Sequence, residues 1–117
     1  MKTALLTIPF VLAVALIVYV EGSFSGFWIW NALPVALGFG ILLAGRHSRL
    51  AIAVGCTAFA ASATLLVILF HLALLFDWGG TASSFSTSAL AFIFVPIWAC
   101  IFAGIAGLLA WGIIRLV

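Results

Sequence analysis

The scarcity of charged side chains constrains this chain more than any other feature of its sequence. Four Lys and Arg residues and two Asp and Glu residues are the only charged ones among 117 residues, whereas 68% of the residues are hydrophobic. A typical soluble domain is about 25% charged, because its surface must face water. So few charges cannot cover a globule of this length. We therefore predict that hydrocarbon, rather than water, is the main solvent of the chain.

Four apolar segments of helical length lie between the charged residues. A transmembrane helix needs about 20 mostly apolar residues, and short polar or glycine-containing stretches divide the chain into segments of about that length. The predicted spans are residues 3–20, 27–45, 50–76 and 88–114. We therefore predict an all-α fold, an integral membrane four-helix transmembrane bundle in which residues 1–117 form a single domain.

The first apolar segment also has the general form of a secretory signal peptide, in which a basic residue precedes an apolar run. Residues 3–20 are longer than the usual apolar core of about 7–15 residues in a signal peptide. The segment ends in Tyr19, Val20 and Glu21, without a small-x-small cleavage site. We therefore expect it to be retained as the first span.

The charged residues sort by sign between the two sides of the predicted bundle. The basic residues lie before the first span, between the second and third, and after the fourth, and we expect them to anchor the chain at one membrane surface: Lys2, Arg46, Arg49 and Arg115. Glu21 and Asp77 fall in the two connections on the other side. Because Lys and Arg are enriched in cytoplasmic connections, we predict that both termini are cytoplasmic, most simply in a bacterial inner membrane.

Neither the net charge nor its local density indicates a more specific charged partner. A net charge of +2, dispersed along the chain, does not indicate nucleic-acid binding. The basic turn from Arg46 to Arg49 falls short of the four to eight Lys and Arg residues that indicate recognition of a particular lipid. From the sequence alone we assign this turn to anchoring in the bilayer surface only.

Small residues are concentrated in the third and fourth apolar segments. Lipid tails are as apolar as leucine, so helices in a bilayer associate mainly where small residues let their backbones approach closely. The residues that we expect to serve this packing are Gly55, Ser62, Ala99, Ala103 and Gly107. They either pack in a hairpin within one chain or contact another subunit; the hairpin is favoured because neighbouring elements usually pack together.

The chain carries one group of polar residues that could share a depth in the bilayer. At about 1.5 Å per residue, His71 lies about 33 Å beyond Arg49, near the outer edge of the hydrocarbon. The candidate outer-rim polar cluster is His71, Glu21, Asn31 and Asp77. Ionisable residues within a membrane indicate function by default, and His is the side chain best suited to gain or lose a proton near neutral pH. The competing interpretation, favoured at this shallow depth, is that His71 extends to the interface or hydrogen-bonds a neighbour.

Other chemistry is not indicated by the sequence. His47 and His71 fall at opposite sides, so they cannot hold a haem between them, and no three or four ligands cluster as zinc requires. Cys56 and Cys100 lie about 10 Å and about 22 Å deep, too far apart for the disulfide Cα separation of about 4.4–6.8 Å. We expect no catalytic residue, no metal site and no cofactor.

These observations favour a non-enzymatic membrane protein that acts through helix–helix contacts. The expected partners are the lipid bilayer and either other membrane protein subunits or a second copy of the chain. Such a protein would be an accessory or structural subunit of a larger complex, or a self-associating scaffold. The alternative is a small dimeric transporter or channel with a polar site around His71 and Glu21.

Overall fold

The computed structural model describes residues 2–21, 27–76 and 85–117. Within these residues the chain forms four helices and no strand. They are α1 (Lys2–Glu21), α2 (Phe27–Gly45), α3 (Leu50–Leu75) and α4 (Phe85–Leu116). The predicted all-α class and number of helices are confirmed. The largest difference from the predicted limits is at α4, which begins at Phe85 rather than at residue 88.

Two of the helices are long and apolar enough to cross a bilayer, over Leu50–Ala73 in α3 and Ile93–Leu116 in α4. The apolar parts of the other two, Ala4–Val20 in α1 and Ile29–Gly45 in α2, are shorter. Helices of this length and composition also occur in the cores of soluble proteins and in signal sequences. The structure therefore contains two candidate membrane spans, and the four-span bundle stays a prediction.

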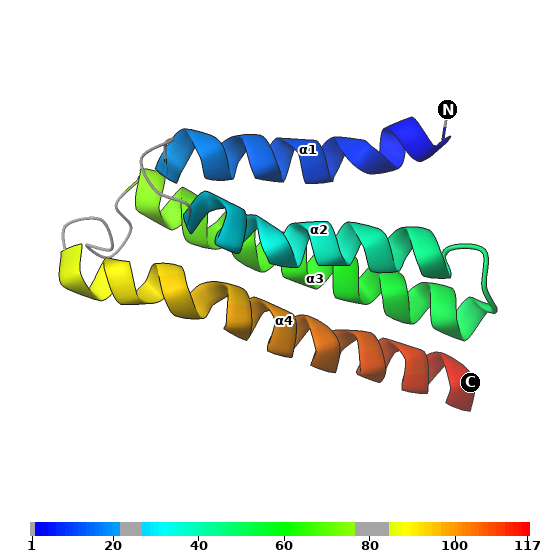
Figure 1. The fold of residues 1–117 in the computed structure, drawn as a ribbon. Coiled ribbons are helices and arrows are strands. Elements are labelled where there is room, and N and C mark those ends of the chain that lie inside the picture. Colours follow the sequence, from blue (N-terminus) through cyan, green and yellow to red (C-terminus); the bar gives the residue numbers. More distant parts are fainter. Residues whose placement is uncertain (1, 22–26, 77–84) are drawn as a thin grey trace.

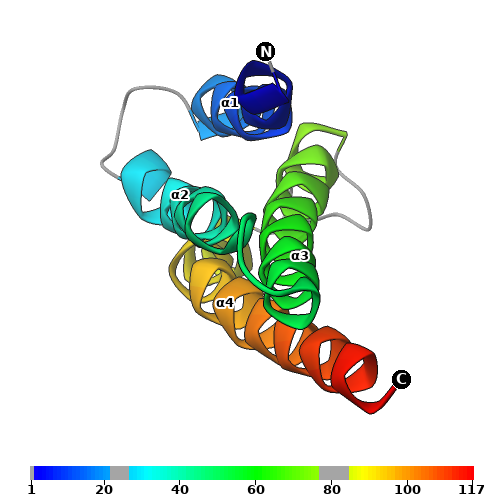
Figure 2. The ribbon, with the colours of Figure 1, turned by 90° about the vertical axis from the view of Figure 1, so that its right-hand side faces the viewer.

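The helices run alternately up and down, with α2 and α4 pointing in the same direction (Figure 1). Seen along the bundle, α2 and α3 lie between α1 and α4 (Figure 2). Both α1 and α4 contact α2 and α3, whereas α1 and α4 do not contact each other in the described part of the chain. The most extensive contact is between α3 and α4.

One end of the bundle, here called the basic end, carries both chain termini and the turn of residues 46–49 (Figure 1). In this turn the backbone N–H of Arg46 donates to the Leu42 carbonyl at 3.0 Å, and that of Ser48 donates to the Gly45 carbonyl at 3.0 Å. Helix α3 then starts with a bond from the Ala53 N–H to the Arg49 carbonyl at 2.9 Å. Glu21, the last residue of α1, lies at the opposite end.

The interior is built largely of small and β-branched side chains, and long apolar side chains point outward. The buried core cluster consists of Ala13, Ile17, Val35, Val67 and Ala99. Leu12, Leu65 and Leu108 are 62%, 56% and 69% exposed. A soluble domain buries such leucines first, so the distribution is the reverse of the one that water favours.

Candidate functional site

His71 is enclosed in the interior of the bundle, one turn before the end of α3. Its side chain is 0% exposed, so the ring does not extend to the surface. Its Nδ1 lies 2.8 Å from the carbonyl oxygen of Val67, one turn earlier on the same helix. Because a carbonyl can only accept, this contact indicates that Nδ1 carries the proton, and Nε2 of the neutral ring is then an acceptor. The ring also meets Phe70 edge-on, with ring centroids 5.2 Å apart.

Asn31 on α2 is also fully buried, at 0% exposure, and it lies at nearly the same level as His71. The antiparallel register of α2 and α3 is fixed where Gly38 meets Ala60 and Gly45 meets Cys56. Counting back along both helices from these contacts brings Asn31 level with residues 67–70 of α3. The two polar side chains are therefore within about one helical turn of each other along the bundle.

Thr64 is a third buried polar side chain, on the same face of α3 as His71 because the two are seven residues apart. It is 6% exposed. Its hydroxyl oxygen is buried without a hydrogen-bond partner among the described residues. Three buried polar side chains therefore lie on α2 and α3, and the polar cluster predicted from the sequence included His71 and Asn31 but not Thr64.

The predicted polar cluster also included Glu21 and Asp77. Glu21 ends α1, and Asp77 lies outside the described residues. The structure encloses His71 and Asn31 within about one helical turn of each other along the bundle. The sequence suggests a candidate cluster at the outer rim and favours a His71 that extends to the interface or hydrogen-bonds a neighbour.

No metal or disulfide site is found in the described part of the chain. No group of three or more His, Cys, Asp and Glu residues there could hold a metal ion. Cys56 and Cys100 are both free and half-buried.

Gly55 of α3 and Gly107 of α4 meet at the closest approach of these two helices. A Cβ atom built on Gly55 would lie 3.0 Å from the Gly107 carbonyl oxygen, and a Cβ on Gly107 would lie 3.0 Å from the Gly55 carbonyl oxygen. Ala99 and Ala103 are buried on the same face of α4, at 2% and 0% exposure, and Ser62 is half-buried. The small residues singled out from the sequence therefore face the interior of one chain, as the hairpin alternative requires.

A second close approach, between α2 and α3, was missed by sequence reasoning. A Cβ on Gly38 would lie 3.1 Å from the Cα of Ala60, and a Cβ on Gly45 would collide with the side chain of Cys56. Gly38 and Gly45 are seven residues apart and therefore share one helix face. That spacing is the sequence signal that could have identified this contact.

Three other glycines have open space where a side chain would be. A Cβ atom on Gly40, Gly104 or Gly112 would meet nothing within 4 Å among the described residues. On α2, Gly40 continues an exposed row of small residues at four-residue spacing, which we call the α2 stripe: Ala36, Gly40 and Ala44.

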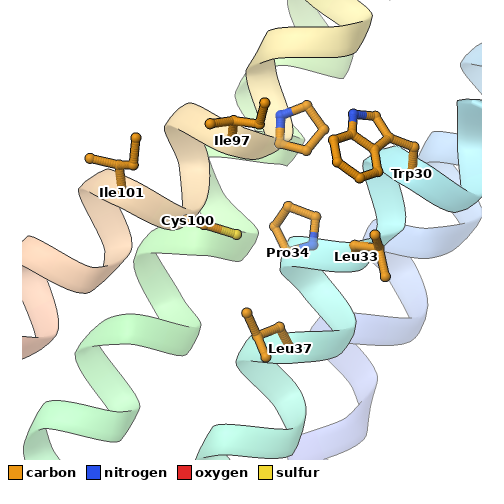
Figure 3. A pocket seen from close by; sticks show the side chains of 8 residues that line it. Trp30, Leu33, Pro34, Leu37, Ile97, Cys100 and Ile101 are labelled. Atoms are coloured by element: carbon orange, nitrogen blue, oxygen red, sulfur yellow. The ribbon is translucent and has the colours of Figure 1, made fainter.

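Beside the α2 stripe, an apolar groove of about 430 Å³ runs between α2 and α4 (Figure 3). Pro34 of α2 and Pro96 of α4 both line it. At one side the indole Nε1–H of Trp30 donates to the carbonyl oxygen of Ile93 at 2.9 Å. Toward the basic end a further cavity of about 350 Å³ contains Gly104 in its wall; this cavity is lined by residues of α3 and α4 and by Ile41 of α2. We call the two together the α2–α4 groove.

None of the three buried polar side chains, Asn31, Thr64 and His71, lines the α2–α4 groove. Its walls are apolar side chains, backbone and the thiols of Cys56 and Cys100. Such a surface offers shape and close backbone approach rather than groups for acid–base or nucleophilic chemistry. Comparisons with known protein families, with curated proteins and with solved structures find no match.

Proposed function

We propose that this chain is a non-enzymatic membrane protein that crosses the bilayer four times and acts through contacts of its helices. In this proposal the basic end lies in the cytoplasm, and the chain serves as an accessory subunit of a larger membrane complex or as a self-associating scaffold. The observation that carries the proposal is the pair of open glycines on the α2 stripe and in the α2–α4 groove, Gly40 and Gly104.

The membrane setting is supported by what the bundle exposes. Each exposed Å² of apolar surface costs roughly 25 cal/mol in water, and long apolar side chains are exposed on all four helices. Hydrocarbon removes that cost. The gathering of Lys2, Arg46, Arg49 and Arg115 at one end (Figure 1) supports a cytoplasmic basic end, since Lys and Arg favour that side.

The role in helix contacts is supported by the contrast between two kinds of glycine. Glycine inside a helix is less stable than alanine by roughly 0.5–1 kcal/mol. At Gly38, Gly55 and Gly107 a neighbour in the same chain lies so close that it leaves no room for a side chain.

At Gly40, Gly104 and Gly112 no described neighbour lies so close. Of these three, Gly40 lies in an exposed row of small residues and Gly104 in the wall of a groove, whereas Gly112 lies in neither. Glycine at positions 40 and 104 is explained if a helix of another chain packs on the α2 stripe or in the α2–α4 groove, because small residues let helices approach closely in lipid.

The test is co-purification from mild detergent of wild type and of single glycine variants. We expect wild type to form a homo-oligomer or to retain a partner in fixed ratio, and Gly40→Leu or Gly104→Leu to lose it. Gly112→Leu is the matched control, because Gly112 is equally open but lies outside the α2 stripe and the α2–α4 groove. A strictly monomeric wild type without a partner would contradict the proposal.

A second candidate, a small transporter or channel, is favoured by one observation, the enclosure of His71 and Asn31 at nearly one level. Ionisable side chains buried in a membrane often belong to proton or ion paths. Toward the basic end, however, the next buried polar side chain is Thr64, two turns away on α3. Proton and cation flux into proteoliposomes distinguishes the candidates: flux that His71→Ala abolishes supports transport, and equal background flux in both proteins removes it.

A further inference from the structure

A groove of a different character opens at the basic end, between α1, α2 and α3. Its volume is about 510 Å³. It is lined by Leu6 of α1, by Leu42 of α2, by Arg46 in the turn that follows α2, and by five residues of α3. The α3 residues are Ala53, Val54, Thr57, Ala58 and Ala61. We call it the Arg46 groove.

The long wall of the Arg46 groove is a strip of small side chains on α3. Ala53, Thr57 and Ala61 recur at four-residue spacing, so they follow one another along the helix. The Thr57 hydroxyl donates to the Ala53 carbonyl at 2.8 Å, so this polar group is satisfied by its own helix. From residue 53 to residue 61 the helix rises about 12 Å. The wall therefore suits an extended apolar chain better than a compact molecule.

Arg46 is the single charged residue among those that line this groove, and its side chain is half-buried. Arg49, in the same turn, is exposed and adds positive charge nearby. Of the two acidic residues in the chain, Glu21 ends α1 at the far end of the bundle, and Asp77 follows the far end of α3 in the sequence. The groove is thus apolar along its length and positive where it reaches the basic end.

We propose that the Arg46 groove binds one anionic phospholipid from the leaflet at the basic end. The lipid phosphate accepts hydrogen bonds from the Arg46 guanidinium, and one acyl chain lies along Ala53, Thr57 and Ala61. Charge complementarity selects an anionic headgroup, because a zwitterionic lipid would bring its own cation close to the basic turn. A free phosphate ion would leave the apolar wall unused. The inference rests on the proposed membrane setting but not on the proposed helix contacts.

The test is a native mass spectrometry titration of the purified, detergent-solubilised chain with phosphatidylglycerol or with phosphatidylcholine of the same acyl chains. We expect one phosphatidylglycerol per wild-type chain and weaker binding of phosphatidylcholine. Arg46→Gln should weaken phosphatidylglycerol binding at least about tenfold, as loss of a charge-assisted hydrogen bond predicts. Arg49→Gln is the matched comparison, because it removes a charge from the same turn but does not line the groove. It should weaken binding clearly less than Arg46→Gln does, by at most about fivefold.

A second variant tests the acyl-chain part of the site. Ala61 is exposed in the groove wall, so Ala61→Leu narrows the groove without crowding the core and should weaken phosphatidylglycerol binding. The inference is overturned if Arg49→Gln has the same effect as Arg46→Gln, if Ala61→Leu binds as wild type does, or if inorganic phosphate competes as effectively as the lipid. Binding is counted per chain, so failure here is distinguishable from a failure to associate through Gly40 and Gly104.

Discussion

At the residue scale, the helical glycines are of two kinds. At some positions a neighbouring helix leaves no room for a side chain, and at others the space beside the glycine is empty. There is no room for a side chain at Gly107, because an added Cβ would lie 3.0 Å from the Gly55 carbonyl oxygen and 3.3 Å from the Phe59 Cβ. Gly107→Ala should therefore lower the free energy of unfolding by about 1–3 kcal/mol, the usual cost of overpacking. Equilibrium unfolding in mixed detergent micelles measures this change.

Gly112→Ala provides the control on the same helix, because a Cβ there would meet nothing within 4 Å among the described residues. We expect it to be neutral or to stabilise the helix by up to about 1 kcal/mol, since alanine is the better helix former. Equal losses of stability in Gly107→Ala and Gly112→Ala would show that the contact between Gly55 and Gly107 does not limit the packing of α3 on α4.

The contribution of a buried polar side chain to the free energy of unfolding can be measured by comparing His71 with His47. The His71 ring is fully buried and bonded to the Val67 carbonyl, whereas His47 is exposed in the basic turn. His71→Ala leaves a cavity and should cost about 2–4 kcal/mol of unfolding free energy. His47→Ala should stay within about 0.5 kcal/mol of wild type. Similar stabilities for the two variants, measured in the same micelles, would contradict the enclosed position of His71.

The depth of His71 along its helix could be predicted from the sequence, but its direction could not. Residue counting at a fixed rise placed it near the outer end of the third helix. The face on which it lies depends on which side of α3 meets α2, and α3 is apolar on every side. Without an apolar-to-polar contrast around the helix, periodicity carries no signal for that choice. The enclosed positions of Asn31 and Thr64 escaped prediction for the same reason.

At the element scale, α2 and α4 are tied together beside a proline. The Trp30 indole of α2 donates to the Ile93 carbonyl of α4 at 2.9 Å, three residues before Pro96. Pro96 removes the helical hydrogen bond to the carbonyl of residue 92, four positions earlier, and disturbs the preceding turn. The Ile93 carbonyl that accepts from Trp30 lies in that disturbed turn, where a donor from a neighbouring helix is favourable. Trp30→Phe removes the donor and should cost about 0.5–1.5 kcal/mol of unfolding free energy.

A double-mutant cycle identifies the role of this bond. In a Pro96→Ala background the helix can form its regular hydrogen bonds, so we expect the cost of Trp30→Phe to fall. Trp98→Phe is the control, because Trp98 stacks on Phe102 at the exposed face of α4 and a phenyl ring retains that contact. An unchanged cost of Trp30→Phe in the Pro96→Ala background would contradict the link between the indole and the proline.

The helix limits were predictable to within a few residues, and the difference at α4 has a physical reason. The sequence predicts a loop up to Thr87 because this stretch is rich in Gly, Ser and Thr, which are poor in helix interiors. The first turn of a helix accepts these residue types, because its N–H groups have no acceptor within the helix. Composition alone therefore placed the start of α4 at residue 88 rather than at Phe85.

At the scale of the whole molecule, the main feature is where side chains of different size lie. Small residues fill the interior and long apolar ones face outward, so the helices are held together by close backbone approach, and two of them are long and apolar enough to cross a bilayer. The sequence predicted the all-α class and the number of helices, and its prediction of a hydrocarbon solvent stays a prediction. It could not predict that α2 and α3 lie between α1 and α4 (Figure 2), because this arrangement depends on individual contacts such as Gly38 with Ala60.

The central claim, a bundle in lipid with its basic end in the cytoplasm, is tested most directly by labelling one residue of the exposed basic turn. Ser48 is exposed, and Cys56→Ala with Cys100→Ala provides a background free of other cysteines. In bacterial cells that express the chain, we predict that Ser48→Cys is found in the membrane fraction and reacts with a membrane-impermeant maleimide only after the cells are disrupted. Labelling of intact cells, or recovery of the chain in the soluble fraction, would contradict the account.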